Sequence, residues 1–136
     1  MSRCLIAYFS TALVFWLLDA VWLGVVVKDF TQLELGPLLL SAPQKAPAIA
    51  FYLLYVVGIV IFVVLPALDT DSLWRALGLG ALFGLIAYAT YDLSNMATLK
   101  GWSTNFSLLD MAWGAFATAI ASTAGWAVTR AVVARL

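Results

Sequence analysis

The chain has 136 residues and is 65% hydrophobic and only 10% charged, so a soluble domain of this length could not cover its apolar surface and we expect an integral membrane protein. The formal net charge is zero, which gives no basic surface for nucleic acid, and no nucleic-acid partner is expected. With no histidine and a single cysteine, Cys4, the sequence excludes histidine-based zinc sites, cysteine–histidine nucleophile pairs and an intrachain disulfide, and we expect neither a metal site nor a cofactor.

The first apolar run, residues 4–27, is longer than the hydrophobic region of a signal peptide and contains Asp19. No small-residue cleavage site follows it, so we interpret it as a retained span. Three more runs are long enough to cross a hydrocarbon core, at residues 46–68, 73–97 and 106–133. Continuous apolar runs favour helices over barrel strands, which alternate. The prediction is an all-α, four-transmembrane-helix bundle with antiparallel neighbours, forming a single integral-membrane domain over residues 1–136.

The connections between these spans differ in kind. Residues 28–45 are long, partly apolar and broken by prolines, which predicts an interfacial segment between the first two helices. Residues 69–72 and 98–105 predict tight turns, with Asp71 or Ser72 as the N-cap of the third helix.

Basic residues separate by type between the two sides of this topology. Four arginines lie on the side of the two termini, and three lysines lie on the opposite side. The positive-inside rule assigns the side with more basic residues to the cytoplasm, so we expect both termini there. These residues are Arg3, Arg75, Arg130 and Arg135 on one side, and Lys28, Lys45 and Lys100 on the other.

Three aspartates inside the spans are expected at one depth. Asp19 lies ~24 Å along the first helix from Arg3, and Asp92 lies ~26 Å along the parallel third helix from Arg75, at ~1.5 Å per residue. Asp110 begins the fourth helix, which starts from the surface that the third has reached. Intramembrane carboxylates must face protein or water. The spacing therefore predicts a polar pocket that opens toward the lysine side.

Each aspartate has a neighbour three residues later on the same helix face. The echo of LLDAVWLG (17–24) in LLDMAWG (108–114) pairs aspartate with tryptophan twice. Tyrosines of the second and third helices lie at the matching level. The candidate ligand-binding residues are Asp19, Trp22, Tyr55, Tyr88, Asp92, Asn95, Asp110 and Trp113.

Structural roles remain open for the same residues. Asp110 could belong to a capping box with Ser107 as N-cap. Asp92 could pair with Lys100, and the three lysines together could neutralise all three aspartates. The tryptophans could be interfacial anchors.

Small residues mark close helix contacts. Gly80 and Gly84 form a GxxxG pattern on the face that presents Asp92, and Gly114 lies on the corresponding face of the fourth helix. We expect packing there, and a homo-oligomer through the Gly80/Gly84 or Gly114 face is an open possibility.

Several stretches resemble a known family. FYLLYVVGIVIFVVLPAL (51–68), ALFGLIAYATYDLSNMATLKGW (81–102) and LLDMAWG are similar to those of small four-helix bacterial membrane proteins of unknown function. The resemblance implies a bacterial inner membrane and a compact four-span architecture. It supplies no activity.

Three functions remain open at this point. The first is binding or transport of a cation, a proton or a polar small molecule through the carboxylates, which would require more than one copy because four helices are few for alternating access. The second is an enzyme acting on a lipid or isoprenoid through the same carboxylates. The third is an accessory subunit of a larger membrane complex. Membrane lipids are expected partners in each case.

Overall fold

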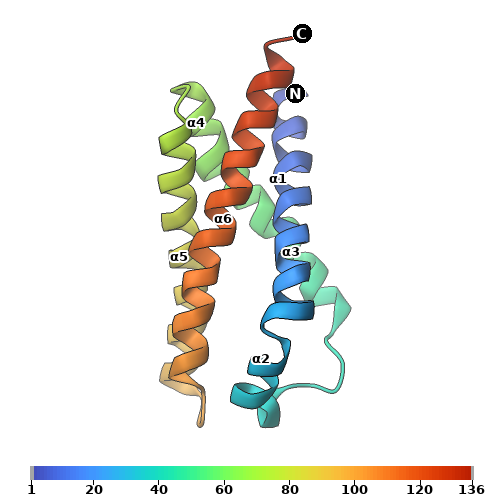
Figure 1. The fold of residues 1–136 in the computed structure, drawn as a ribbon, viewed down its shortest axis with the longest axis vertical. Helices are drawn as coiled ribbons and strands as arrows, with labels where there is room; N and C mark the ends of the chain where they lie inside the picture. The colour runs from blue at the N-terminus through green and yellow to red at the C-terminus, as the bar shows by residue number, and fades with distance from the viewer. Residues whose placement is uncertain (1, 136) are drawn as a thin grey trace.

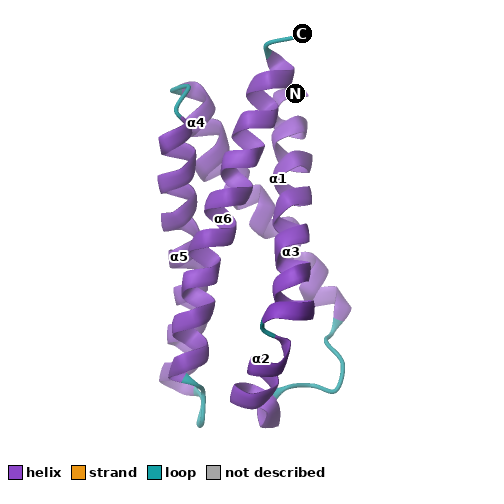
Figure 2. Cartoon of the chain, in the orientation of Figure 1, coloured by secondary structure: helices purple, strands orange, loops and turns teal. Residues whose placement is uncertain are grey.

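The computed structural model describes residues 2–135, and in this part of the chain every regular element is helical. Figure 2 shows loops at the short connections, before α3 and after α6. The elements, in chain order, are α1 (Ser2–Val21), η1 (Trp22–Val26), α2 (Lys28–Leu35), η2 (Gly36–Leu38), α3 (Lys45–Ile59), η3 (Val60–Val64), α4 (Leu65–Asp69), α5 (Leu73–Thr98) and α6 (Thr104–Val133).

Four helical segments are long and apolar enough to cross a membrane, which confirms the predicted fold class. They run over Ser2–Val26, Lys45–Asp69, Leu73–Thr98 and Thr104–Val133, so their bounds differ from the predicted ones by at most two residues. The first span is α1 continued by the π-helical turn η1, and the second joins α3, the π-helical η3 and α4. A π-helical turn holds one extra residue and so rotates the faces of the helix that follows it.

The helices are arranged around α6. It packs against α5 on one side and α1 on the other, while α3, η3 and α4 cross diagonally behind them (Figure 1). The chain ends lie together at one end of the bundle, which we call the arginine end. The turn between α5 and α6 lies with α2 at the opposite end, which we call the lysine end.

Small residues form the seam between α5 and α6. A Cβ atom on Gly84 would lie 2.0 Å from the carbonyl oxygen of Gly114, and one on Gly80 would lie 2.1 Å from the Ser122 hydroxyl. Gly114 in turn lies beneath the ring of Tyr88. Both glycine faces proposed for a homo-oligomer are therefore occupied within the chain. A second copy would have to use another face.

Large apolar side chains point away from the bundle. Leu54 and Trp74, for example, are more than 70% exposed, whereas the interior along α6 is built from alanine, threonine, serine and glycine. This distribution suits a chain whose surroundings are hydrocarbon, because close helix approach and van der Waals packing, not water exclusion, hold transmembrane helices together.

The segment between the first two spans forms short helices. α2 buries Leu35 and contacts α6, and the Ser103 hydroxyl before α6 donates a hydrogen bond to Glu34. Helix α2 thus lies against the lysine end of the bundle.

Serine caps begin both long C-terminal helices. Ser72 accepts a hydrogen bond from the backbone N–H of Arg75. It is therefore the N-cap of α5, and of the two predicted candidates, Asp71 and Ser72, the second is confirmed. Ser103 does the same for Phe106, so α6 begins at Thr104. The capping box built on Ser107 and Asp110 was wrong, because Ser107 lies inside the helix, where it is buried.

Candidate functional site

The three aspartates lie toward the lysine end, on the last turns of α1 and α5 and the early turns of α6. Asp19 and Asp92 are buried, at 4% and 0% exposure, and Asp110 is half-buried. No group of three acidic side chains among residues 2–135 is arranged to hold a metal ion. By their nearest polar partners the carboxylates fall into two neighbouring groups, Asp19 alone and Asp92 with Asp110.

Asp19 is held by partners from two other helices. The Tyr52 hydroxyl of α3 donates a hydrogen bond to one carboxyl oxygen, and Trp113 Nε1 of α6 donates to the other at 3.2 Å. The Trp113 ring is stacked on that of Trp22, with centroids 4.3 Å apart and planes 2° from parallel. The two aspartate–tryptophan motifs thus meet across the bundle, because Trp113 of the second motif contacts both Asp19 and Trp22 of the first.

Asp92 faces α6 and the turn before it. The polar groups around its carboxyl are Ser107, Asp110 and Trp102. Trp102 Nε1 donates its hydrogen bond to the Ser107 hydroxyl at 2.9 Å, and neither carboxyl oxygen of Asp92 has a hydrogen-bond partner within residues 2–135. A fully buried carboxylate in that state is costly, because burial removes water without a compensating bond.

Lysines do not neutralise these aspartates. Across the described residues the ion pairs are Arg3–Asp69 and Arg130–Asp71, both at the arginine end. Lys100 is exposed and forms no ion pair with Asp92, so both the Asp92–Lys100 pair and the purely structural lysine–aspartate network were wrong. Lys28 and Lys45 are the first residues of α2 and α3, and Lys100 lies in the turn after α5.

The remaining predicted site residues lie around these two centres. The Tyr55 hydroxyl forms a hydrogen bond with the Thr118 hydroxyl at 2.8 Å and contacts no aspartate. Tyr88 packs on Gly114 and lies 6.2 Å from the Tyr55 ring, centroid to centroid. Asn95 is half-buried, and no hydrogen bond among residues 2–135 joins it to an aspartate.

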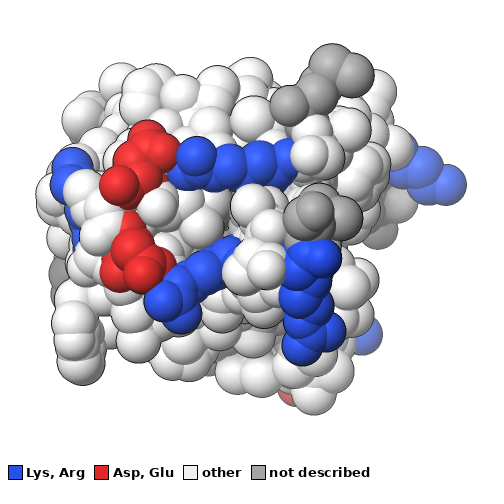
Figure 3. All heavy atoms as spheres, turned by 90° about the horizontal axis from the view of Figure 1, so that it is seen from above, with Lys and Arg blue, Asp and Glu red and all other residues white. Residues whose placement is uncertain are grey.

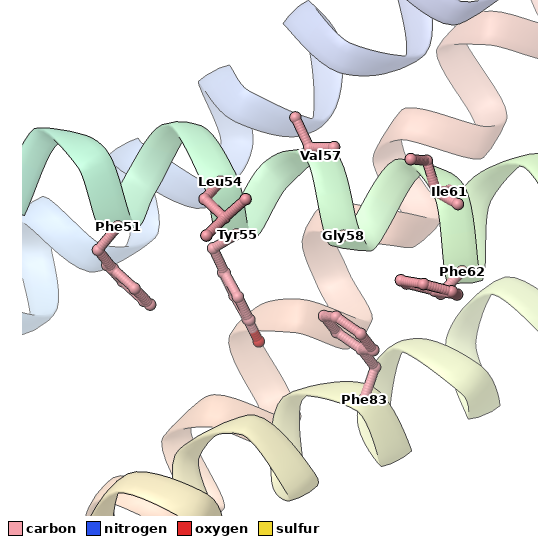
Figure 4. A pocket seen from close by; sticks show the side chains of 8 residues that line it. All are labelled: Phe51, Leu54, Tyr55, Val57, Gly58, Ile61, Phe62 and Phe83. Atoms are coloured by element: carbon pink, nitrogen blue, oxygen red, sulfur yellow. The ribbon is translucent and has the colours of Figure 1, made fainter.

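The predicted polar pocket does not coincide with either cavity that stands out in residues 2–135. One is an apolar groove of about 420 Å³ between the second span and α5, where Tyr55 and Phe83 extend from opposite helices (Figure 4). The other lies at the arginine end. Asp19, Asp92 and Asp110 line neither, so their carboxyl groups are packed within the helix interfaces.

Three residues of the two sites were missing from the predicted set. Tyr52 lies one turn before Tyr55 on α3, and only Tyr55 was included in the predicted set. Ser107 was considered only as a cap, and Trp102 only as an anchor. The sequence signal that could have identified them is their expected depth along the bundle, which is the same as that of the aspartates.

Comparison with known proteins supports the membrane assignment. No curated protein and no solved structure matches the chain. Residues 4–127 match a family described as "Predicted membrane protein (DUF2177)". With nearly the whole chain matched, the protein belongs to this family of predicted membrane proteins.

Proposed function

We propose that this membrane protein binds a proton or a small cation at the Asp92–Asp110 pair, as the ligand-binding step of transport or sensing. The observation that carries the proposal is Asp92 itself, which is fully buried with both carboxyl oxygens unpaired and a second carboxyl group beside it. Two neighbouring carboxylates repel each other when both are ionised, and a positive ligand removes that repulsion.

The donor set favours a proton or a monovalent cation. It consists of two carboxyl groups and the Ser107 hydroxyl, whereas Ca²⁺ takes six to eight oxygen ligands and Mg²⁺ requires octahedral geometry. Asp110 is half-buried while Asp92 is not exposed, so Asp110 lies on the side from which a ligand would enter.

Asp19 takes a structural role in this proposal. Its two oxygens accept hydrogen bonds from Tyr52 and Trp113, which satisfies the carboxylate without a ligand. It therefore serves as the internal control for the Asp92–Asp110 pair.

Infrared difference spectroscopy between neutral and alkaline pH tests proton binding directly, because exposed carboxyl groups are already ionised at neutral pH and a carboxyl group that is still protonated there has a C=O stretch that a carboxylate lacks. We expect the wild-type protein in lipid nanodiscs to show this band and Asp92→Asn and Asp110→Asn to lose or shift it. Asp19→Asn should retain it. A band that survives in both Asp92→Asn and Asp110→Asn would contradict the proposal for protons.

Cation binding has a separate readout. At fixed pH, sodium or potassium should raise the unfolding temperature of the wild-type protein and not that of Asp92→Asn. If neither cation acts and the infrared band is absent, the proposed function is overturned.

The setting of this function is proposed as a bacterial inner membrane with both termini in the cytoplasm. The arginine end carries the larger number of basic residues, which supports that orientation. Four helices leave little room for a transport path, so transport would need a homo-oligomer. Native mass spectrometry from the membrane should then give a dimer or larger species.

An enzyme acting on a lipid or isoprenoid is the second candidate. It is favoured by the apolar groove, whose lining comes entirely from the second span and Phe83 of α5. The groove reaches Tyr55 but none of the three aspartates, so it does not bring an apolar substrate to the carboxylates. Turnover of a lipid that persists in Asp92→Asn and Asp110→Asn would favour a groove-centred activity over the cation proposal.

A further inference from the structure

A second polar cavity lies at the arginine end, away from the aspartate sites. It has a volume of about 330 Å³ and is lined by Arg3, Asp71, Thr129, Arg130 and the apolar side chains Leu68 and Val133, among others. These residues come from the ends of α1, α4 and α6 and the turn after α4, where three spans terminate. The cavity is therefore at the depth of lipid headgroups.

Thr129 gives this cavity a buried polar wall. The side chain is 0% exposed, lines the cavity, and its hydroxyl has no hydrogen-bond partner within residues 2–135. A buried hydroxyl without a partner costs free energy that a bound acceptor or donor would recover.

Two arginine side chains, Arg3 and Arg130, line the same cavity. Arg3 donates through Nη2 to Asp69 Oδ1 at 2.7 Å and to the carbonyl oxygen of Leu65 at 3.3 Å. Arg130 lies over the Trp126 ring and pairs with Asp71, with Nε 2.5 Å from Oδ1 and Nη2 2.9 Å from Oδ2. Each guanidinium carries five N–H donors, so the Nη1 groups of both arginines are left over from these bonds.

The two aspartates hold the arginines in ion pairs at the surface of the bundle. Their side chains are 65% and 59% exposed, and exposed ion pairs contribute little to stability. Figure 3 looks onto this end and shows acidic side chains beside basic ones, with further basic side chains around them. With Arg75 and Arg135 included, four arginines stand against two aspartates here, an excess of two positive side-chain charges (4 − 2).

We propose that this cavity binds a phosphate group through Arg3, Arg130 and the Thr129 hydroxyl. Guanidinium groups match phosphate oxygens in bidentate geometry, and a hydroxyl donor completes a three-sided site. Basic pockets between transmembrane helices at one membrane face are suited to anionic lipid headgroups. A soluble phosphate compound offers the same chemistry, so the source has to be separated by experiment.

The test uses the full-length protein in maltoside micelles, which contain no phosphate. Short-chain phosphatidylglycerol and inorganic phosphate are added in separate titrations, and affinity is taken from the shift in unfolding temperature. Stabilisation by the lipid alone identifies a headgroup site, and stabilisation by both identifies a site for the phosphate group itself. If neither stabilises the protein, the proposal is overturned.

Variants localise the effect. Arg130→Gln and Thr129→Val should each weaken binding by about tenfold or more, as expected for the loss of a hydrogen bond to a charged group. Thr129→Val preserves side-chain volume, so it stays informative if Arg130→Gln folds poorly. Arg75→Gln is the matched control, since it removes a charge at the same end without lining the cavity. If Arg75→Gln weakened phosphate binding equally, or if Thr129→Val left it unchanged, the binding would be explained by general charge attraction. Either result would overturn the proposed phosphate site.

Discussion

Asp19 and Asp92 are both aspartates at the lysine end of the bundle, but they differ in the hydrogen-bond partners around them. Both are buried, at 4% and 0% exposure. Asp19 accepts hydrogen bonds on both carboxyl oxygens from two other helices. Asp92 lies near a second carboxyl group, that of Asp110, and within residues 2–135 no donor is placed to form a hydrogen bond with either of its oxygens. An intramembrane carboxylate is therefore not by itself a functional signal. What distinguishes the two is whether the protein provides the partners that burial demands.

The α5–α6 seam sets the distance between Asp92 and Asp110, so opening it should disrupt that pair first. Gly84→Val would place side-chain atoms where the Gly114 carbonyl oxygen already lies, 2.0 Å from the new Cβ. We expect a loss of about 3 kcal/mol in the free energy of unfolding. Reversible unfolding in bicelles measures it. Gly78→Val is the control, because a Cβ there meets nothing within 4 Å, and equal losses for both would show that the seam is not under packing constraint.

Removing Asp19 should destabilise the bundle. Asp19→Leu leaves the Tyr52 hydroxyl and the Trp113 N–H without their acceptor, at an expected cost of about 2–3 kcal/mol in the free energy of unfolding. The same bicelle measurement applies. A variant as stable as the wild-type protein would mean that Asp19 is not a structural acceptor, and the comparison with Asp92 would fail.

A smaller change isolates one bond of the Asp19 site. Trp113→Phe removes the N–H donor to Asp19 while keeping an aromatic ring against Trp22. We expect a loss of about 1 kcal/mol. In the Asp19→Leu background the same substitution should cost less, because its partner is already gone, and a double-mutant cycle measures the difference. Strict additivity would show that the two residues do not interact.

The smallest expected effect has the opposite sign. Asp92→Leu removes an unpaired buried carboxyl group, so the unfolding free energy should stay unchanged or rise by less than about 1 kcal/mol. Any stabilisation by sodium or potassium that depends on the Asp92–Asp110 pair should vanish with it. A loss as large as that of Asp19→Leu would indicate that Asp92 has structural partners and would remove the contrast between the two sites.

Hydropathy and helix geometry were enough to predict the architecture. Membrane thickness sets the length of a span, so four apolar runs located four helices to within two residues at each end. The same rise per residue placed Asp19, Asp92 and Asp110 toward one end. The cap of α5 at Ser72 was also predicted, since a short turn leaves few side chains to choose from.

Side-chain partners were not predictable in the same way, because they depend on how each helix is rotated about its axis. A single turn on α3 separates Tyr52, which contacts Asp19, from Tyr55, which bonds to Thr118. An apolar helix has almost no periodic pattern to indicate its rotation. The π-helical turns at Trp22–Val26 and Val60–Val64 shift that rotation further, and nothing in the local sequence marks them. The hydrogen bonds of Tyr52 and Trp113 to Asp19 were therefore not predictable from the sequence pattern.

The stacked indoles of Trp22 and Trp113 have an optical consequence. Two nearly parallel rings 4.3 Å apart couple their electronic transitions, and this coupling produces a paired positive and negative band in circular dichroism when the in-plane transition dipoles of the two indoles are rotated relative to each other. One ring belongs to the end of the first span and the other to α6, so the band reports whether these two segments are joined at the lysine end. The stacked indoles thus give a label-free spectroscopic marker of the contact between the first span and α6, and Trp22→Phe is the control that lacks it.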